Sequence, residues 1–372
     1  MRMEDGQILE AVERRRAEAL EVHEFVHDHP ELSHEEHECC RHLATVLEQG
    51  GLDVETGLAG MPTAFRATLR GRSPGRAVGL VAVYDAVPVF RPDGTIEPVH
   101  SCGHDAISGG VVAAALALAE LRDELAGSVV VFGCPADEIP APRTVELGGG
   151  KALLAAAGLW DGIDAALYAH PEFEDTVFLR SRWMRRERAM VTGIRSLTGE
   201  REAPTEAVAA AIDAVRRLPP ADAIVEHILL EGDVEDRGGL SARIHFVLRA
   251  DEESGLDDLA APLHAALPDA TWEQDPLVCG LRADETVRDA IRDAVLSLGR
   301  EFVDEPAQLP FGTDFGNVTQ RVPGALIGIG RPGGWAFHTD EGAEQFAADG
   351  HEAALAIARI LALASARLTA PG

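Results

Sequence analysis

Four short segments spread along the chain carry side chains that could bind a metal ion. The first is VHSCGHD, residues 99–105, which places Cys102 and His104 two residues apart between a loop and a predicted helix. In an extended turn alternate side chains point the same way, so a thiolate and an imidazole can reach one metal. A Cys-x-His pair on its own is more often incidental than metal-binding.

The other three segments each come after an apolar run or in a glycine-flanked loop. In VVVFGCPADEIP a predicted buried strand ends just before Asp137 and Glu138. His170 closes ALYAHP, and His338 lies in GWAFHTDE. Open α/β sheets place their ligands at the carboxyl ends of strands. An acidic loop or a structural histidine explains each segment alone, but together they offer Cys, His, Glu and His, the ligand types of zinc and similar divalent ions.

Apolar periodicity predicts the elements that position these segments. Two helices fill the first fifty residues, one from Ile8 to His27 and one that follows a Ser33–Glu36 capping box and runs to Gly50. Strands are predicted over 63–69, 77–83, 128–132, 165–168 and 325–329, and helices over 105–121, 151–157 and the C-terminal segment. Strands that alternate with helices predict an α/β fold with a mainly parallel sheet covered by helices.

The middle of the chain has a different pattern. Residues 184–278 contain a predicted strand, a helix, two further strands and a second helix, which is typical of a small α+β unit. We therefore predict that 1–183 and 279–372 form one α/β domain, and that 184–278 form a second domain inserted into it.

Composition restricts the classes of function. The chain has 372 residues, 46% of them hydrophobic and 26% charged, with a formal net charge of −29. This charge argues against nucleic acid or an anionic membrane surface as a partner. The N-terminus has no apolar stretch after its charges, and five cysteines do not favour a disulfide framework. These features predict a reduced, cytoplasmic protein.

Taken in order, the segments resemble the aminoacylase/carboxypeptidase family of dinuclear metallopeptidases (peptidase family M-twenty). The matching stretches are HDHPELSHEEHE, VYDAVP, HSCGHD, GCPADE, AHP, GTDFGNVTQRVPG and FHTDE. They look most similar to the branch that holds aminobenzoyl-glutamate hydrolase, hippurate hydrolase and indole-acetyl-amino-acid hydrolases. GTDFGNV points to the part of this branch that resembles aminobenzoyl-glutamate hydrolase.

The resemblance implies two divalent metal ions per chain, zinc first and manganese or cobalt as alternatives. It implies five ligands: Cys102, His104, Glu138, His170 and His338. It makes Asp137 the general acid/base, places Asp85 near the metals, and places Arg249 near a substrate carboxylate. It also implies that the inserted domain acts as a lid and as the contact surface of a homodimer.

The chain departs from the family pattern at three places. The stretch VTGIRSLTGEREAP lacks the lid histidine, VEDRGGLSAR lacks an asparagine, and Asp137 stands where the family has glutamate. His227 is a possible substitute polar group, although a structural histidine is the commoner case. The glycines at 148–150 before Lys151 lack the spacing of a phosphate loop and predict the start of a helix. Lys151 is the only lysine in the chain, which we attribute to codon bias.

The leading interpretation is an amidohydrolase that cleaves a small N-acyl amino acid, an aminobenzoyl-glutamate-like amide or a dipeptide by a metal-activated water. One alternative is a metal-binding member of the family with weak or altered hydrolysis, in a biosynthetic or scaffold role. The other is a true dipeptidase or aminopeptidase, which would require a free α-amino group.

Overall fold

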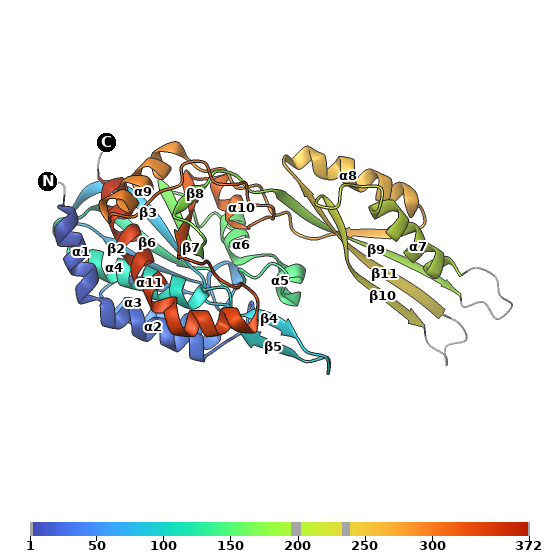
Figure 1. Cartoon of the computed structure of the whole chain (residues 1–372), viewed down its shortest axis with the longest axis horizontal. Coiled ribbons are helices and arrows are strands. Elements are labelled where there is room, and N and C mark those ends of the chain that lie inside the picture. The colour runs from blue at the N-terminus through green and yellow to red at the C-terminus, as the bar shows by residue number, and fades with distance from the viewer. Residues whose placement is uncertain (1–2, 195–201, 233–238, 371–372) are drawn as a thin grey trace. The chain divides into compact units, whose positions relative to one another are not determined.

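The computed structural model describes residues 3–194, 202–232 and 239–370 (Figure 1). The chain divides into two compact units, the first made of Met1–Arg180, Arg282–Gln308 and Asp314–Gly372. The second unit comprises Ser181–Leu281 and Leu309–Thr313. The predicted insertion, 184–278, lies within the second unit, which extends three residues further on either side and also takes in the short return segment.

The first unit is built on a seven-stranded sheet with the order β1-β2-β6-β3-β7-β13-β8. Strands β6, β3, β7 and β13 are neighbours and run parallel, whereas β1, β2 and β8 are antiparallel to their partners. The sheet therefore is mainly parallel at its centre, as the sequence predicts. The strand bounds are β1 Asp53–Thr56, β2 Phe65–Arg70, β3 Ser73–Ala82, β6 Ala126–Gly133, β7 Ala165–Glu172, β8 Thr176–Phe178 and β13 Gly324–Gly330.

Helices flank this sheet. Helix α4 and the C-terminal helix α11 pack on each other and against the central strands β3 and β7, and α2 packs on α4 (Figure 1). Small residues allow this close packing, since a Cβ on Gly110 of α4 would lie 2.6 Å from the Ile357 side chain of α11. The helix bounds are α1 Asp5–Arg14, α2 Arg16–Asp28, α3 His37–Gln49, α4 His104–Glu120, α5 Pro142–Leu147, α6 Gly150–Ala156, α9 Glu285–Ser297, α10 Phe315–Thr319 and α11 Asp340–Leu368. A hairpin of β4 (Val87–Phe90) and β5 (Ile96–Val99) precedes α4.

Two local predictions are wrong. The helix predicted from Ile8 to His27 is interrupted at Arg15, which separates α1 from α2. The Ser33–Glu36 capping box does not form, because the Ser33 hydroxyl donates to Asp85 Oδ2 at 2.7 Å and Glu36 Oε1 accepts from the backbone N–H groups of His34 and Ala136. Each side chain thus contacts a residue far along the chain, and neither caps the N-terminus of α3.

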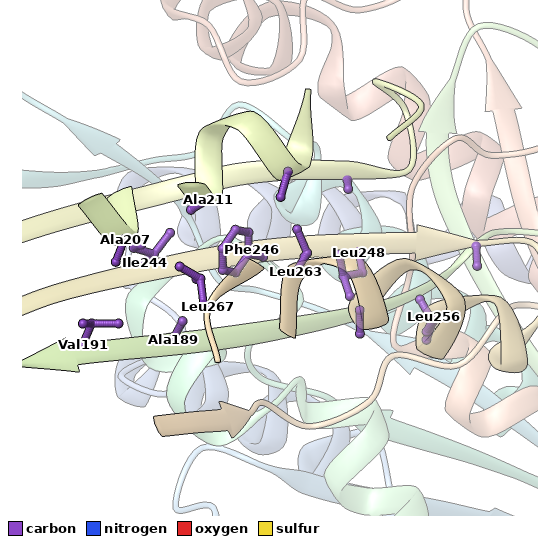
Figure 2. Close-up of a cluster of buried hydrophobic side chains, with 14 of the residues drawn as sticks. Ala189, Val191, Ala207, Ala211, Ile244, Phe246, Leu248, Leu256, Leu263 and Leu267 are labelled. Carbon is purple, nitrogen blue, oxygen red and sulfur yellow. The ribbon is translucent and has the colours of Figure 1, made fainter. Parts of the chain in front are cut away.

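The second unit has a four-stranded antiparallel sheet with the order β10-β11-β9-β12 and, among its described residues, two helices. Its bounds are β9 Trp183–Ile194, α7 Ala203–Val215, β10 Ala223–Gly232, β11 Gly239–Ala250, α8 Glu253–Ala266 and β12 Thr271–Gln274. Alternate residues of β11, among them Ile244, Phe246 and Leu248, form a core with Leu256 and Leu263 of α8 (Figure 2). This unit has a core of its own, as expected for an inserted domain. No helix among the described residues is long and apolar enough to cross a membrane.

Candidate metal centre

The predicted ligands lie at the ends of strands or in the loops between strands and helices of the first unit. Glu138 lies just after β6, and His170 lies near the carboxyl end of β7. Cys102 precedes α4 and His104 is its first residue, while His338 lies between β13 and α11. Because β6, β3, β7 and β13 are parallel neighbours, their carboxyl ends meet at one edge of the sheet.

The structure brings all five side chains together, with Cys102 at the centre. Its Sγ lies 3.5 Å from His170 Nε2 and 3.3 Å from His338 Nε2. His338 Nε2 is in turn 3.7 Å from Glu138 Oε2. Two sets of possible metal ligands result, each with its ligand atoms within 4.8 Å of one another: Cys102 with His104 and His170, and Cys102 with Glu138 and His338. The sulfur is shared by both sets, so one thiolate could contribute to the binding of two adjacent ions.

Backbone carbonyls fix the tautomers of two of these histidines. The Nδ1 of His104 lies 2.7 Å from the Asp85 carbonyl oxygen, and the Nδ1 of His170 lies 2.7 Å from that of Pro171. A carbonyl can only accept, so each Nδ1 carries a proton and each Nε2 is directed to the cluster. Hydrogen bonds of this kind orient histidine ligands in metalloproteins.

Asp85 connects several parts of the cluster. Besides its carbonyl, its Oδ2 accepts hydrogen bonds from the Ser33 hydroxyl at 2.7 Å and from the Glu138 backbone N–H at 2.9 Å. Its Oδ1 lies 3.0 Å from His104 Nδ1. Asp85 therefore holds His104 and the Glu138 backbone in position, behind the ligand atoms themselves.

The ionisable groups of the cluster shift one another's pKa values. Burial alone raises the pKa of the Cys102 thiol, but the imidazoles of His104 and His170 outweigh it and hold that pKa well below its ordinary value. The thiolate is the form that binds metal. Burial, followed by the charge of Cys102, raises the pKa of Glu138 well above its usual range.

Buried ligand atoms that form no hydrogen bonds also indicate that these five side chains can bind divalent metal ions. Among the described residues Glu138 Oε1 is buried without a hydrogen-bond partner, and buried His104 Nε2 makes no hydrogen bond although Asp137 Oδ2 lies 3.2 Å away. A buried polar atom without a partner is costly, and coordination to a metal would satisfy both atoms. One thiolate, three imidazoles and one carboxylate are ligands typical of zinc.

The loops that carry these ligands adopt unusual backbone conformations. His338 and Ala136 have φ values of 60° and 59°, and Gly103, between two ligands, has φ of 88°. The His338 N–H donates to the Ser101 carbonyl at 3.0 Å, which ties its loop to the Cys102 segment. Sparsely populated backbone conformations are enriched at functional sites.

Asp137 lies beside the ligands, and its carboxylate is held by residues outside the predicted set. Its Oδ2 is 3.2 Å from His104 Nε2 and accepts a hydrogen bond from the Tyr168 hydroxyl at 2.7 Å. Its Oδ1 is paired with the ammonium of Lys151, which is fully buried and also 2.7 Å from Asp314 Oδ1. Burial raises the pKa of Asp137, but Lys151 and then His104 outweigh it and hold that pKa well below its usual range.

The roles of Lys151, Tyr168 and Asp314 were not predicted from the sequence. One feature of the sequence, the presence of a lysine at position 151, could have indicated these roles. It is the only lysine in the chain, and it stands in the first turn of α6, where the helix dipole disfavours a cation. A cation at that position is favourable only if carboxylates lie nearby, which could have suggested that Lys151 pairs with acidic residues of the site.

Arg249 and His227 belong to the second unit. Arg249 lies at the end of β11, half-buried, and its Nε has no hydrogen-bond partner among the described residues. Burial, and then the charge of Arg182, lowers its pKa. His227 is exposed on β10, with its ring centroid 5.5 Å from that of His245. The segments in which the lid histidine and the asparagine are missing lie partly outside the described residues, at 195–201 and 233–238.

A mainly parallel sheet whose strand ends gather a thiolate, imidazoles and carboxylates defines an α/β protein with a metal-binding site. The chain belongs to peptidase family M20/M25/M40, whose sequence profile matches residues 79–363. It is 30% identical over 174 residues to one of the subunits of p-aminobenzoyl-glutamate hydrolase of Escherichia coli, a match that covers 44% of this chain and 34% of that protein. It is 22% identical over 360 residues to N-acetyl-L-cysteine deacetylase of Bacillus subtilis, covering 85% of this chain and 81% of the relative.

The fold has close counterparts among solved structures. The YXEP protein of Bacillus subtilis, a dinuclear metal binding peptidase from the M20 family, matches with a TM-score of 0.67 at 21% identity. The match covers 93% of this chain and 98% of that one. This agreement over nearly the whole chain supports the predicted fold, including the inserted antiparallel unit.

Proposed function

We propose that the protein is an amidohydrolase that holds two divalent metal ions and cleaves the amide bond of a small N-acyl amino acid or a related amide. The observation that carries this proposal is the shared Cys102 sulfur, which belongs to both sets of ligand atoms. Membership of the peptidase family and similarity to a deacetylase and to part of an aminobenzoyl-glutamate hydrolase support it.

In this proposal Cys102, His104 and His170 hold one ion, and Cys102, Glu138 and His338 hold the other. When bound, such ions polarise a carbonyl group and lower the pKa of a bound water. Zinc is the ion proposed first, on the donor types, with manganese and cobalt as alternatives.

Asp137 is proposed to move the proton. Its Oδ2 faces the ligand atoms, 3.2 Å from His104 Nε2, so it can take a proton from the attacking water and pass it to the leaving nitrogen. Its low pKa keeps it ionised at neutral pH, as an acceptor must be. The Tyr168 hydroxyl, which donates to the same oxygen, limits the directions from which that proton can arrive.

Arg249 is proposed to bind the carboxylate of the substrate's amino-acid part. Its Nε has no hydrogen-bond partner in the part of the chain that the structure describes, and the net charge of −29 means that an anionic substrate needs a local cation. The inserted domain that carries Arg249 is proposed to serve as a lid and as the contact surface of a homodimer in the cytoplasm.

A substrate panel tests the proposal. Protein loaded with zinc, manganese or cobalt would be assayed on N-acyl amino acids, aminobenzoyl-glutamate and dipeptides. We expect turnover of at least one N-acyl compound, its loss in Cys102→Ser and its retention in Cys279→Ser, a cysteine of the second unit. Activity confined to substrates with a free α-amino group would identify a dipeptidase. Metal binding without turnover of any compound would favour the alternative of a family member that does not hydrolyse amides.

A further inference from the structure

Lys151 lies in a slot built from three other side chains. It has no exposed surface, its ammonium is paired with both Asp137 and Asp314, and it lies 5.0 Å from the centre of the Tyr168 ring. Burial lowers the pKa of Lys151, but the two carboxylates outweigh it and raise that pKa above its ordinary value. The ammonium is therefore a permanent charge next to Asp137, at a cost that only close partners can offset.

The start of α6 is shaped so that Lys151 reaches this position. Asp314 Oδ2 accepts hydrogen bonds from the backbone N–H groups of Lys151 at 2.9 Å and Ala152 at 3.3 Å. A Cβ at Gly149 would lie 2.3 Å from Asp314 Oδ2, and one at Gly150 would lie 2.0 Å from the Pro135 carbonyl oxygen. The two glycines thus allow the helix to approach Asp314 on one side and the loop before Asp137 on the other.

The slot suits lysine better than arginine. A compact ammonium can donate to two carboxylates at once from a point, whereas the planar guanidinium needs more room and a different geometry. The chain uses arginine for every other positively charged side chain apart from its histidines. Use of lysine here, in a fully buried position, is consistent with selection by the shape of the slot.

We propose that Lys151 is a positioning residue for amide hydrolysis, which holds Asp137 by Oδ1 so that Oδ2 faces the metal ligands. This inference rests on the proposed function, since it takes Asp137 as the group that moves the proton. Lys151 fixes one oxygen and the Tyr168 hydroxyl fixes the other, so the plane of the carboxylate is set from two sides. Without Lys151 the carboxylate can rotate away from the ligands, and a displacement of about 1 Å can lower the rate about 10²-fold.

The presence of a single lysine allows a direct test of this geometry that needs no substrate. Protein labelled with ¹³C and ¹⁵N in lysine has one set of side-chain signals, all from Lys151. We expect a charged ammonium whose protons exchange slowly with solvent, and whose signals shift in Asp137→Asn. Signals typical of a mobile, solvent-exposed lysine, or signals that Asp137→Asn leaves unchanged, would overturn the proposal.

Kinetics then test the positioning role. Removal of the ammonium alone leaves two buried carboxylates unpaired, which is destabilising. We therefore compare Asp314→Asn, which keeps the pair with Asp137, with the double variant Lys151→Met/Asp314→Asn. Loss of the lysine should lower kcat about 10²-fold, with KM and metal content nearly unchanged.

A further set of variants, which also carry Asp137→Asn, distinguishes a positioning role of Lys151 from an effect on the stability of the fold. When Asp137→Asn is also present, Lys151→Met should lower kcat no further, since the group that it positions is already gone. An equal effect of Lys151→Met with and without Asp137 would overturn the positioning role. Failure of the proposed function has a different signature, namely wild-type protein that turns over no amide although the lysine signals behave as expected.

Discussion

Replacement of Glu36 by glutamine is expected to remove a loss of stability that the wild-type protein suffers between pH 5 and pH 7. Glu36 has no exposed surface, and its Oε1 accepts hydrogen bonds from His34 N at 2.9 Å and Ala136 N at 2.8 Å. Its Oε2 has no hydrogen-bond partner among the described residues. A glutamine carbonyl can accept both bonds, so the substitution removes the ionisable group and keeps the contacts.

The size of the effect follows from the pKa of this carboxyl group. Burial, and then the charge of Asp85, raises the pKa of Glu36 from 4.5 to about 8. A raised carboxyl pKa favours the protonated form in the folded state, so its contribution is fully present below pH 4.5 and is lost as pH rises towards 8. With about 1.4 kcal/mol per pH unit, the loss is roughly 1 kcal/mol at pH 5 and roughly 3 kcal/mol at pH 7.

Urea unfolding of metal-free protein at pH 5 and pH 7 measures this difference. Wild-type protein should lose about 2 kcal/mol more between these pH values than Glu36→Gln. Glu35→Gln is the matched control, because Glu35 is adjacent and exposed, and it should follow the wild type. If wild type and Glu36→Gln have the same pH dependence, Glu36 is not a buried neutral acid, and the reasoning is refuted.

Three further predictions concern the site. Asp137→Asn should lower kcat to a small but measurable residual rate and keep the metals. Asp137→Glu should be slower than wild type because the longer side chain no longer fits between Lys151 and the ligands. Full activity of Asp137→Asn on a true substrate would exclude its proton-transfer role. Arg249→Ala should raise KM about tenfold or more for carboxylate-bearing substrates and much less for their amides. Arg243 is exposed on the same strand, so Arg243→Ala should change the KM of neither kind of substrate. Gly103→Ala should lower metal occupancy in elemental analysis, because Gly103 has φ of 88° and a Cβ there would lie 2.7 Å from the side chains of Phe346 and Pro171. Gly94 has a similar φ of 85° but open space around it, so Gly94→Ala should keep full metal occupancy.

The sequence is sufficient for much of the fold because its patterns are local. The apolar run at 128–132 is a buried central strand, and the small-residue segment after Asp105 is a buried helix, as their composition predicts. The Ser33–Glu36 pattern misled because the competing contacts come from far along the chain. Glu36 bonds to Ala136, one hundred residues away, and no local pattern carries that information.

For the candidate site too, the sequence predicts some features, whereas others depend on contacts between distant residues. Motif order brings the five predicted ligands to one edge of the sheet, but it gives no indication of the tautomers, which depend on the carbonyls of Asp85 and Pro171. The partners of Asp137 were not predicted either. Lys151 and Asp314 are 163 residues apart, and they meet only because two glycines let α6 approach both loops.

The central claim is that Cys102 is shared by two metal ions, and elemental analysis of three proteins tests it most directly. Wild-type protein and Cys279→Ser, purified without chelators and dialysed against metal-free buffer, should each contain about two divalent ions per chain. Cys102→Ser should lose metal from both sets of ligands, because its sulfur lies in each. Two ions retained in Cys102→Ser, or one ion or none in the wild type after incubation with zinc, manganese or cobalt, would contradict the account.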